Sequence, residues 1–277
     1  MKLYFLFGFI VLSIVAQPQI PYGSNKQAGK YADVGGTKIY YETYGKGIPV
    51  VLLHGSVYGY IDEYSSFIPE LEQNFKVIAI ALRGHGKSEI GKEDFSYKLL
   101  AEDVMTILKQ EAADSALVIG FSAGAITGYY LAANYPKSIK KLVTLAGALD
   151  SYHYRPEAVK ELQNLNIHTL KKRDPSFIAN RQKLMPQPER FGEMINRFKK
   201  AWFSGNFIAP AQPNQIQCPV LIIGGDRDFY FPVTSFVSDY KQIKQSQLAI
   251  IPQADHVDMI RKPFIITDLI LPFLMSK

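Results

Sequence analysis

The chain is short of cysteine, of excess charge and of long apolar runs, and each shortage excludes a class of protein. Cys218 is the only cysteine among 277 residues, so an internal disulfide is impossible and stability must come from packing. It precedes an apolar run, where a buried structural thiol is expected. The net charge is +6, and the basic residues are scattered without interleaved aromatics. We therefore expect neither a disulfide-rich scaffold nor a nucleic-acid-binding protein.

The longest apolar run lies at the N-terminus. Lys2 is followed by an apolar stretch, residues 3–15, and then by Ala16 and Gln17, a pattern typical of a secretory signal peptide over residues 1–16. The run is shorter than the roughly 20 residues that span a bilayer, so no stable membrane insertion is expected after cleavage. The sequence predicts export to the periplasm or the medium, with residues 17–29 as a polar leader. Retention in the cytoplasm is the alternative.

Short apolar runs alternate with helical patterns through most of the chain. Gly35 and Gly36 separate two strand-like segments, which indicates a β-hairpin. Buried strands are then expected at residues 49–53, 76–82, 116–121, 140–145, 219–223 and 248–251. Helical patterns occupy residues 96–111, 123–134 and 263–275. This order predicts an α/β fold with a mostly parallel central sheet and an N-terminal antiparallel hairpin.

The alternation stops at residues 150–213, where helical patterns and prolines dominate and no buried strand is evident. We interpret this segment as a helical cap inserted into a core made of residues 30–149 and 214–277. In open α/β sheets, ligands bind beyond the carboxyl ends of the strands, so an inserted cap is expected to cover a substrate site.

A serine between two glycines marks the centre of that site. The apolar run 118–121 ends at Ser122, which Gly120 and Gly124 flank, and a helical pattern follows at once. This is the pattern of a nucleophile elbow, a sharp strand-to-helix turn that exposes the serine hydroxyl. The turn also leaves the N–H of Ala123 at a helix N-terminus, where an oxyanion would form.

A serine nucleophile needs a base and a group that orients the base. Of the five histidines, only His256 lies in a loop after the last strand, and we predict it as the base. Asp228 follows the preceding strand and is the predicted acid. Asp226 is closer to the strand end and is expected to cap the turn, while Asp150, which also follows a strand, remains the alternative acid.

These motifs together resemble the α/β-hydrolase superfamily over about residues 31–275. The matching pieces are Leu-His-Gly-Ser at 53–56, Leu-Arg-Gly-His-Gly-Lys-Ser at 82–88, the elbow, the 225–228 loop and His256. The resemblance implies that the N–H groups of Ser56 and Ala123 form the oxyanion hole, and that His54, Arg83 and His85 order their turns. It implies no cofactor and no metal. Asp255, His256 and Asp258 as metal ligands is a minor alternative, because they share one loop without a distant partner.

Aromatic residues are frequent in the segments that would face this site. We predict Tyr58, Tyr152, Trp202 and Phe229 as pocket residues, with packing inside the cap as the alternative. The expected activity is hydrolysis of a carboxylic ester, or a related acyl bond, of a small apolar or aromatic molecule through an acyl-enzyme. The alternatives are a lactonase, C–C hydrolase, aminopeptidase or perhydrolase using the same triad, or a non-catalytic ligand-binding protein.

Overall fold

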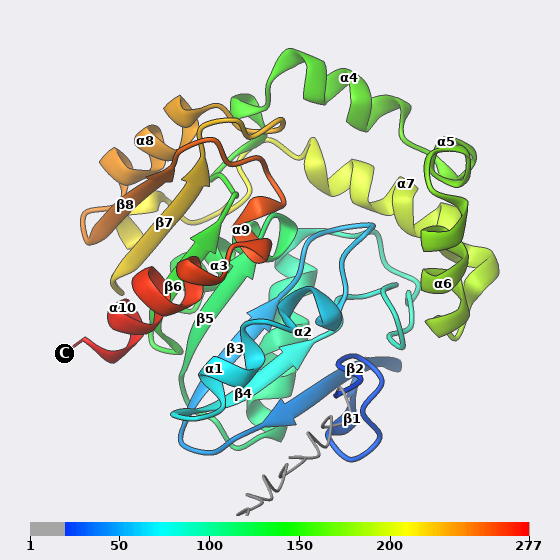
Figure 1. Ribbon diagram of the computed structural model, residues 1–277, viewed down its shortest axis with the longest axis horizontal. Helices are drawn as coiled ribbons and strands as arrows, with labels where there is room; N and C mark the ends of the chain where they lie inside the picture. Colours follow the sequence, from blue (N-terminus) through cyan, green and yellow to red (C-terminus); the bar gives the residue numbers. More distant parts are fainter. Residues whose placement is uncertain (1–19, 277) are drawn as a thin grey trace, which may run out of the picture.

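The computed structural model describes residues 20–276, and the predicted signal peptide lies outside this part of the chain. Figure 1 shows one twisted sheet with helices on both faces and a separate group of helices above one end of it. Within residues 20–276, no helix has both the length and the apolar character that crossing a membrane requires.

The sheet has eight strands in the order β1-β2-β4-β3-β5-β6-β7-β8. The pairs β1–β2 and β2–β4 are antiparallel and the remaining pairs are parallel, which confirms the predicted hairpin and the mostly parallel sheet. The central strands are buried on both faces, as their continuous apolar runs require. The strands are β1 (Gly29–Val34), β2 (Thr37–Tyr44), β3 (Ile48–Leu53), β4 (Phe75–Ile80), β5 (Ala116–Phe121), β6 (Ile139–Leu145), β7 (Val220–Gly225) and β8 (Ser246–Ile251).

The two faces of the sheet carry two apolar clusters. One cluster packs against α2 (Tyr97–Gln110), α3 (Ala123–Asn134) and α8 (Val233–Gln242). The other packs against α1 (Ile68–Leu71), α9 (Asp258–Arg261) and α10 (Leu271–Met275). Both predicted central helices are present, and Ser96 caps α2 by accepting the N–H of Leu99 at 3.1 Å. Both faces of the sheet are therefore covered by helices, and a ligand site is expected at the ends of the strands.

The segment between β6 and β7 is helical and arches over the carboxyl ends of the strands (Figure 1). Two of its helices start at side-chain caps, α5 at Asn166 and α6 at Asp174. Arg181 of α6 anchors it to the core through two hydrogen bonds to Asp62, at 2.7 and 2.9 Å. The elements are η2 (Ser151–His153), α4 (Pro156–Asn164), α5 (Ile167–Arg173), α6 (Pro175–Leu184), η3 (Pro188–Arg190), α7 (Phe191–Trp202) and η4 (Pro213–Gln215).

The C-terminal helix departs from the expectation of one helix over residues 263–275. A wide π-helical turn, η5 (Ile265–Ile270), leads into the short α10 instead. Pro272 has no N–H to donate to the preceding turn, so a regular helix cannot continue through it. The apolar side of this region still packs on the sheet through Ile265, Ile270 and Phe273.

Candidate active site

Ser122 lies at the turn between β5 and α3 with φ of 52° and ψ of −116°. A positive φ is strained for an L-residue other than glycine, and the surrounding turn must hold it there. The N–H of Ser122 donates to the Leu145 carbonyl at 2.8 Å, which ties the turn to β6. A side chain at Gly120 or Gly124 would overlap backbone carbonyls of the facing segments. The glycines therefore permit the close strand-to-helix approach that lifts the Ser122 hydroxyl above the sheet.

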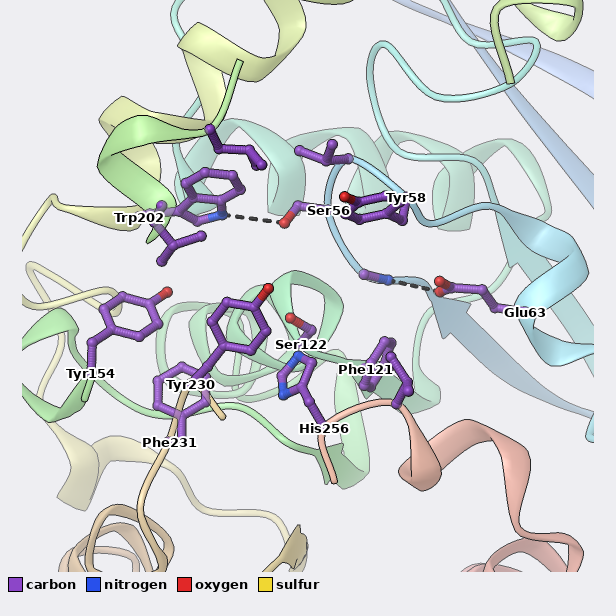
Figure 2. A pocket seen from close by; sticks show the side chains of 15 residues that line it. Ser56, Tyr58, Glu63, Phe121, Ser122, Tyr154, Trp202, Tyr230, Phe231 and His256 are labelled. Carbon is purple, nitrogen blue, oxygen red and sulfur yellow. Dashed lines mark hydrogen bonds between the residues drawn. The ribbon is translucent and has the colours of Figure 1, made fainter. Parts of the chain in front are cut away.

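His256 and Asp228 come from the loops after β8 and β7 and meet beside Ser122. The Nδ1 of His256 lies 2.8 Å from Oδ2 of Asp228. The second carboxylate oxygen, Oδ1, accepts the N–H groups of Tyr230 and Phe231 at 2.8 and 3.0 Å, and Asp228 is only 1% exposed. A carboxylate held in this way keeps the imidazole proton on Nδ1 and leaves Nε2 as an acceptor. Figure 2 shows the His256 ring next to the Ser122 side chain.

The other acids considered for this role do not reach His256. Asp150 accepts the N–H of Tyr152 at 2.9 Å and thereby caps η2. Asp226 instead accepts the N–H of Ala254, in the loop after β8, at 3.3 Å. The structure therefore places Asp228, rather than either competitor, against the imidazole.

The carboxylates of Asp255 and Asp258 are used within their own turn. Asp255 Oδ1 accepts the N–H groups of Val257 and Asp258, and Asp258 Oδ2 accepts that of Asp255. No group of three or more His, Cys, Asp or Glu side chains in residues 20–276 is arranged to hold a metal ion.

Two backbone donors near Ser122 are unpaired within residues 20–276, one in the loop after β3 and one at the start of α3. The N–H groups of Ser56 and Ala123 donate to no acceptor among the described residues. His54 accepts the N–H of Leu82 at Nε2 (2.9 Å), and its Nδ1 lies 2.7 Å from the Gly55 carbonyl. Because C=O and N–H point in opposite directions across a trans peptide, holding the Gly55 carbonyl fixes the direction of the Ser56 N–H. His54 thus orients one of the two predicted oxyanion donors.

His85 holds the other side of this loop. Its Nε2 accepts the N–H of Val57 at 2.8 Å, and its Nδ1 lies 3.0 Å from the Arg83 carbonyl. Val57 has a positive φ of 64°, so this contact supports a strained backbone. Burial lowers the pKa of His54 well below its usual value and that of His85 to about 4. Both rings are therefore neutral near pH 7, and each accepts one backbone N–H, that of Leu82 at His54 and that of Val57 at His85.

Ser122, Ser56 and His256 face a cavity of about 180 Å³ between the sheet and the cap (Figure 2). Two of the predicted pocket residues, Tyr58 and Trp202, line it. The rest of its wall is mainly apolar or aromatic and comprises Val57, Phe121, Tyr154, Leu162, Leu165, Tyr230, Phe231 and Val257. Such a wall favours a small apolar or aromatic group.

The other two predicted pocket residues, Tyr152 and Phe229, do not line the cavity, and that prediction is wrong. Tyr152 is 82% exposed because the η2 turn directs it outward, while Tyr154 faces inward and stacks on Phe231 with ring centroids 4.7 Å apart. Phe229 is 39% exposed. Because Asp228 binds the N–H groups of the second and third residues after it, the chain turns and brings Tyr230 into the wall instead.

One polar residue of the cavity, Glu63 in η1 (Ile61–Tyr64), was not predicted. Its Oε2 accepts the N–H of Gly55 at 3.1 Å (Figure 2), and burial raises its pKa to about 7. In the sequence, Glu63 follows Asp62 in a polar stretch, which is typical of a solvated turn. No sequence signal pointed to it, because its place depends on how the chain folds back after the oxyanion loop.

A wider groove adjoins the cavity. Tyr58, Glu63 and Val257 border both spaces, and the groove has a volume of about 760 Å³. Arg173 and Arg181 of the cap lie along it together with acidic side chains. The cavity therefore has a polar groove beside it, between the cap and the oxyanion loop.

The chain is similar to known proteins over most of its length. Residues 48–199 match the model of the alpha/beta hydrolase fold family. Serine hydrolase BPHL of Homo sapiens is 28% identical over 255 residues, which cover 87% of this chain and 84% of that protein. A 2-hydroxy-6-oxo-6-(2'-aminophenyl)hexa-2,4-dienoic acid hydrolase of Metapseudomonas resinovorans is 23% identical and covers 90% and 91% of the two chains. The crystal structure of an enol-lactonase from Burkholderia xenovorans LB400 matches with a TM-score of 0.72 at 22% identity, covering 89% and 100%.

Proposed function

The chain belongs to the alpha/beta hydrolase fold family, and from this premise we propose that it is a serine hydrolase that cleaves carboxylic esters through an acyl-enzyme. One observation carries the proposal. The buried Asp228–His256 pair lies beside Ser122, and the N–H groups of Ser56 and Ala123, on either side of that serine's cavity, have no acceptor among residues 20–276. A nucleophile, an oriented base and an oxyanion site are together the requirements of acyl transfer.

In the first half-reaction, the Ser122 oxygen attacks the ester carbonyl carbon while Nε2 of His256 accepts the hydroxyl proton. The carbonyl oxygen becomes an oxyanion, which the N–H groups of Ser56 and Ala123 stabilise. The C–O bond to the leaving group then breaks, and His256 returns the proton to the departing alcohol. Asp228 stabilises the imidazolium that exists between these two proton transfers.

In the second half-reaction, water attacks the acyl-enzyme and His256 accepts its proton. The oxyanion forms again at the same two N–H groups, and its collapse releases the carboxylic acid. The proton returns from His256 to Ser122, so the enzyme is regenerated and no cofactor takes part in the steps.

The cavity supports a small apolar or aromatic substrate group. Its volume of about 180 Å³ and its wall of leucine and aromatic side chains disfavour large or highly polar groups. Two of the proteins compared above are named for a lactone and for a dienoic acid substrate. An ester panel that includes lactones and a vinylogous keto acid would therefore separate ester hydrolysis from these related reactions.

The decisive experiment combines covalent labelling with turnover. A fluorophosphonate is expected to label the wild type at Ser122, and p-nitrophenyl esters of short acids are expected to be hydrolysed. Ser122→Ala should lose labelling and lower kcat by about 10⁴- to 10⁶-fold, because the nucleophile is absent. Full activity in Ser122→Ala would contradict the proposal. A wild-type protein that shows neither labelling nor turnover would instead be a binding protein.

A further inference from the structure

The side chain of Ser56 contacts the cap directly. The indole Nε1 of Trp202, the last residue of α7, donates to Ser56 Oγ at 3.2 Å (Figure 2). Trp202 is only 4% exposed, so the indole is held by its surroundings. An indole N–H is a donor only, and the Ser56 oxygen must therefore act as the acceptor in this contact. The hydrogen of the Ser56 hydroxyl remains available.

That hydrogen has no partner in the described structure. Ser56 Oγ donates to no acceptor among residues 20–276, although Ser56 lines the same cavity as Ser122 and His256. The backbone N–H of Ser56 is unpaired as well. One partly exposed residue therefore offers two donors at the wall of the site, both free to bind a ligand there.

The position of Ser56 is fixed on both sides. His54 holds the carbonyl of Gly55, the preceding residue, and His85 holds the N–H of Val57, the following residue. With the backbone fixed, rotation about χ1 is the main freedom left to the Ser56 side chain. The contact with Trp202 selects the rotamer that accepts from the indole.

We propose that the Ser56 hydroxyl is a third donor to the oxyanion, and that Trp202 of the cap is a positioning residue that holds this hydroxyl in place. The inference rests on the proposed function, because the oxyanion forms only if Ser122 attacks a carbonyl. A donor that is oriented before the reaction stabilises the developing charge without having to reorganise. The cap would thus contribute to the chemistry as well as to the shape of the cavity.

The first test separates transition-state stabilisation from substrate binding. Ser56→Ala keeps the backbone N–H and should lower kcat by about 10- to 100-fold with little change in KM. Ser56→Thr keeps a hydroxyl and should recover most of the activity. A trifluoromethyl ketone, which forms a tetrahedral adduct with the serine, should bind Ser56→Ala more weakly by a similar factor. Ser138→Ala, which removes a hydroxyl at the opposite end of the sheet, should behave as the wild type.

The second test is a double-mutant cycle with Trp202→Phe, which keeps an aromatic ring and removes the N–H. We expect a kcat loss of about 3- to 10-fold in the wild-type background and no further loss in Ser56→Ala. An equal loss in both backgrounds would overturn the positioning role of Trp202. A Ser56→Ala variant that changes only KM, or nothing, would overturn the role of the hydroxyl. Failure of the proposed function itself would show separately, as absent labelling and turnover in the wild type.

Discussion

The two walls of the cavity hold their side chains in different ways. The core wall comprises Ser56, Ser122, Tyr230, Phe231 and His256, from the loops that follow sheet strands. The backbone of these loops is hydrogen-bonded to buried side chains, through the Gly55 carbonyl to His54 and through N–H groups to His85 and Asp228. The cap wall comprises Tyr154, Leu162, Leu165 and Trp202. Among residues 20–276, its side chains make a single hydrogen bond, from Trp202 to Ser56.

This difference indicates a division of tasks. Directional hydrogen bonds fix the atoms of the core wall, as acyl transfer requires. Apolar packing holds the cap wall, and packing tolerates changes of side-chain size better than a hydrogen-bonded network does. We therefore expect substitutions in the core wall and its supports to change rate or stability, and substitutions in the cap wall to change which substrate is preferred.

The largest effect expected from this comparison is that of Asp228→Asn. The amide cannot hold the imidazole proton on Nδ1 as a carboxylate does, so His256 loses its role as base. We expect kcat to fall by about 10³- to 10⁴-fold with the fold intact, measured with p-nitrophenyl esters and circular dichroism. Asp150→Asn is the matched control, because Asp150 caps η2 and an asparagine can do the same. Equal losses in both variants would refute the assignment of the acid.

The sequence was sufficient to predict Ser56, Ser122 and His256 of the core wall, because each is marked by a local signal. Continuous apolar runs indicated the buried strands, and the two glycines around Ser122 indicated the elbow. His256 and Asp228 were selected because loops after parallel strands meet at one edge of the sheet. Their contact depends on long-range folding, which is why Asp150 could not be dismissed from the sequence.

The cap wall could not be predicted in the same detail. Tyr152 and Tyr154 are the same residue type and lie two positions apart, so the sequence does not distinguish them. Only the direction of the η2 turn places Tyr154 in the cavity wall and Tyr152 in solvent. The same limit applied to one residue of the core wall: Phe229 was predicted instead of Tyr230, because the turn made by the Asp228 carboxylate cannot be seen in a residue pattern. Local patterns report burial and turns, whereas the side of a cavity that a residue faces is a tertiary property.

The supports of the core wall can be tested through stability. His85→Ala leaves the Val57 N–H without its acceptor and opens a buried cavity, so we expect a loss of about 2–4 kcal/mol at pH 7 in urea unfolding. His168→Ala, a change at an exposed histidine of the cap, should stay within about 0.5 kcal/mol. Comparable losses of unfolding free energy in His85→Ala and His168→Ala would contradict a stabilising role for the buried His85 ring.

The pH dependence of stability gives a second test of His85, in which the wild type is compared with His85→Ala. Burial lowers the pKa of His85 to about 4, while the unfolded chain binds this proton near the ordinary value of about 6.5. The unfolded state therefore takes up more protons between these values, and this part of the stability is lost as the pH falls from about 6.5 to about 4. The stability gap between wild type and His85→Ala should narrow at pH 5, and a gap that widens there would be inconsistent with a neutral buried ring.

The cap wall is tested by Leu162→Ala, which enlarges the cavity without removing a polar contact. We expect the preference for octanoyl over butyryl p-nitrophenyl esters, as a ratio of kcat/KM, to rise by about 3- to 10-fold. Leu170→Ala is the matched control, because Leu170 is buried in the cap but does not line the cavity. It should lower stability and leave the ratio unchanged. A shared shift of the ratio would mean that the whole cap, rather than this wall, sets the preference.

The last effect is a pH-dependent one at Glu63, which supports the core wall at its border with the wider groove. Burial raises the pKa of Glu63 to about 7 from an unfolded value of 4.5, so the folded state binds the extra proton between these values. Stability is therefore lost as the pH rises from about 4.5 to about 7. Glu63→Gln keeps an acceptor for the Gly55 N–H but cannot ionise.

Relative to the wild type, Glu63→Gln should gain about 2–3 kcal/mol in unfolding free energy between pH 5 and pH 8. The raised pKa is a net result, because the Gly55 N–H and the nearby Arg181 favour the ionised carboxylate and offset part of the cost of burial. Glu157→Gln, a change at an exposed residue of α4, should show no such gain. The difference in unfolding free energy between Glu63→Gln and the wild type could instead be the same at both pH values. The Glu63 carboxyl would then be hydrated from the groove, and water would reach this side of the core wall.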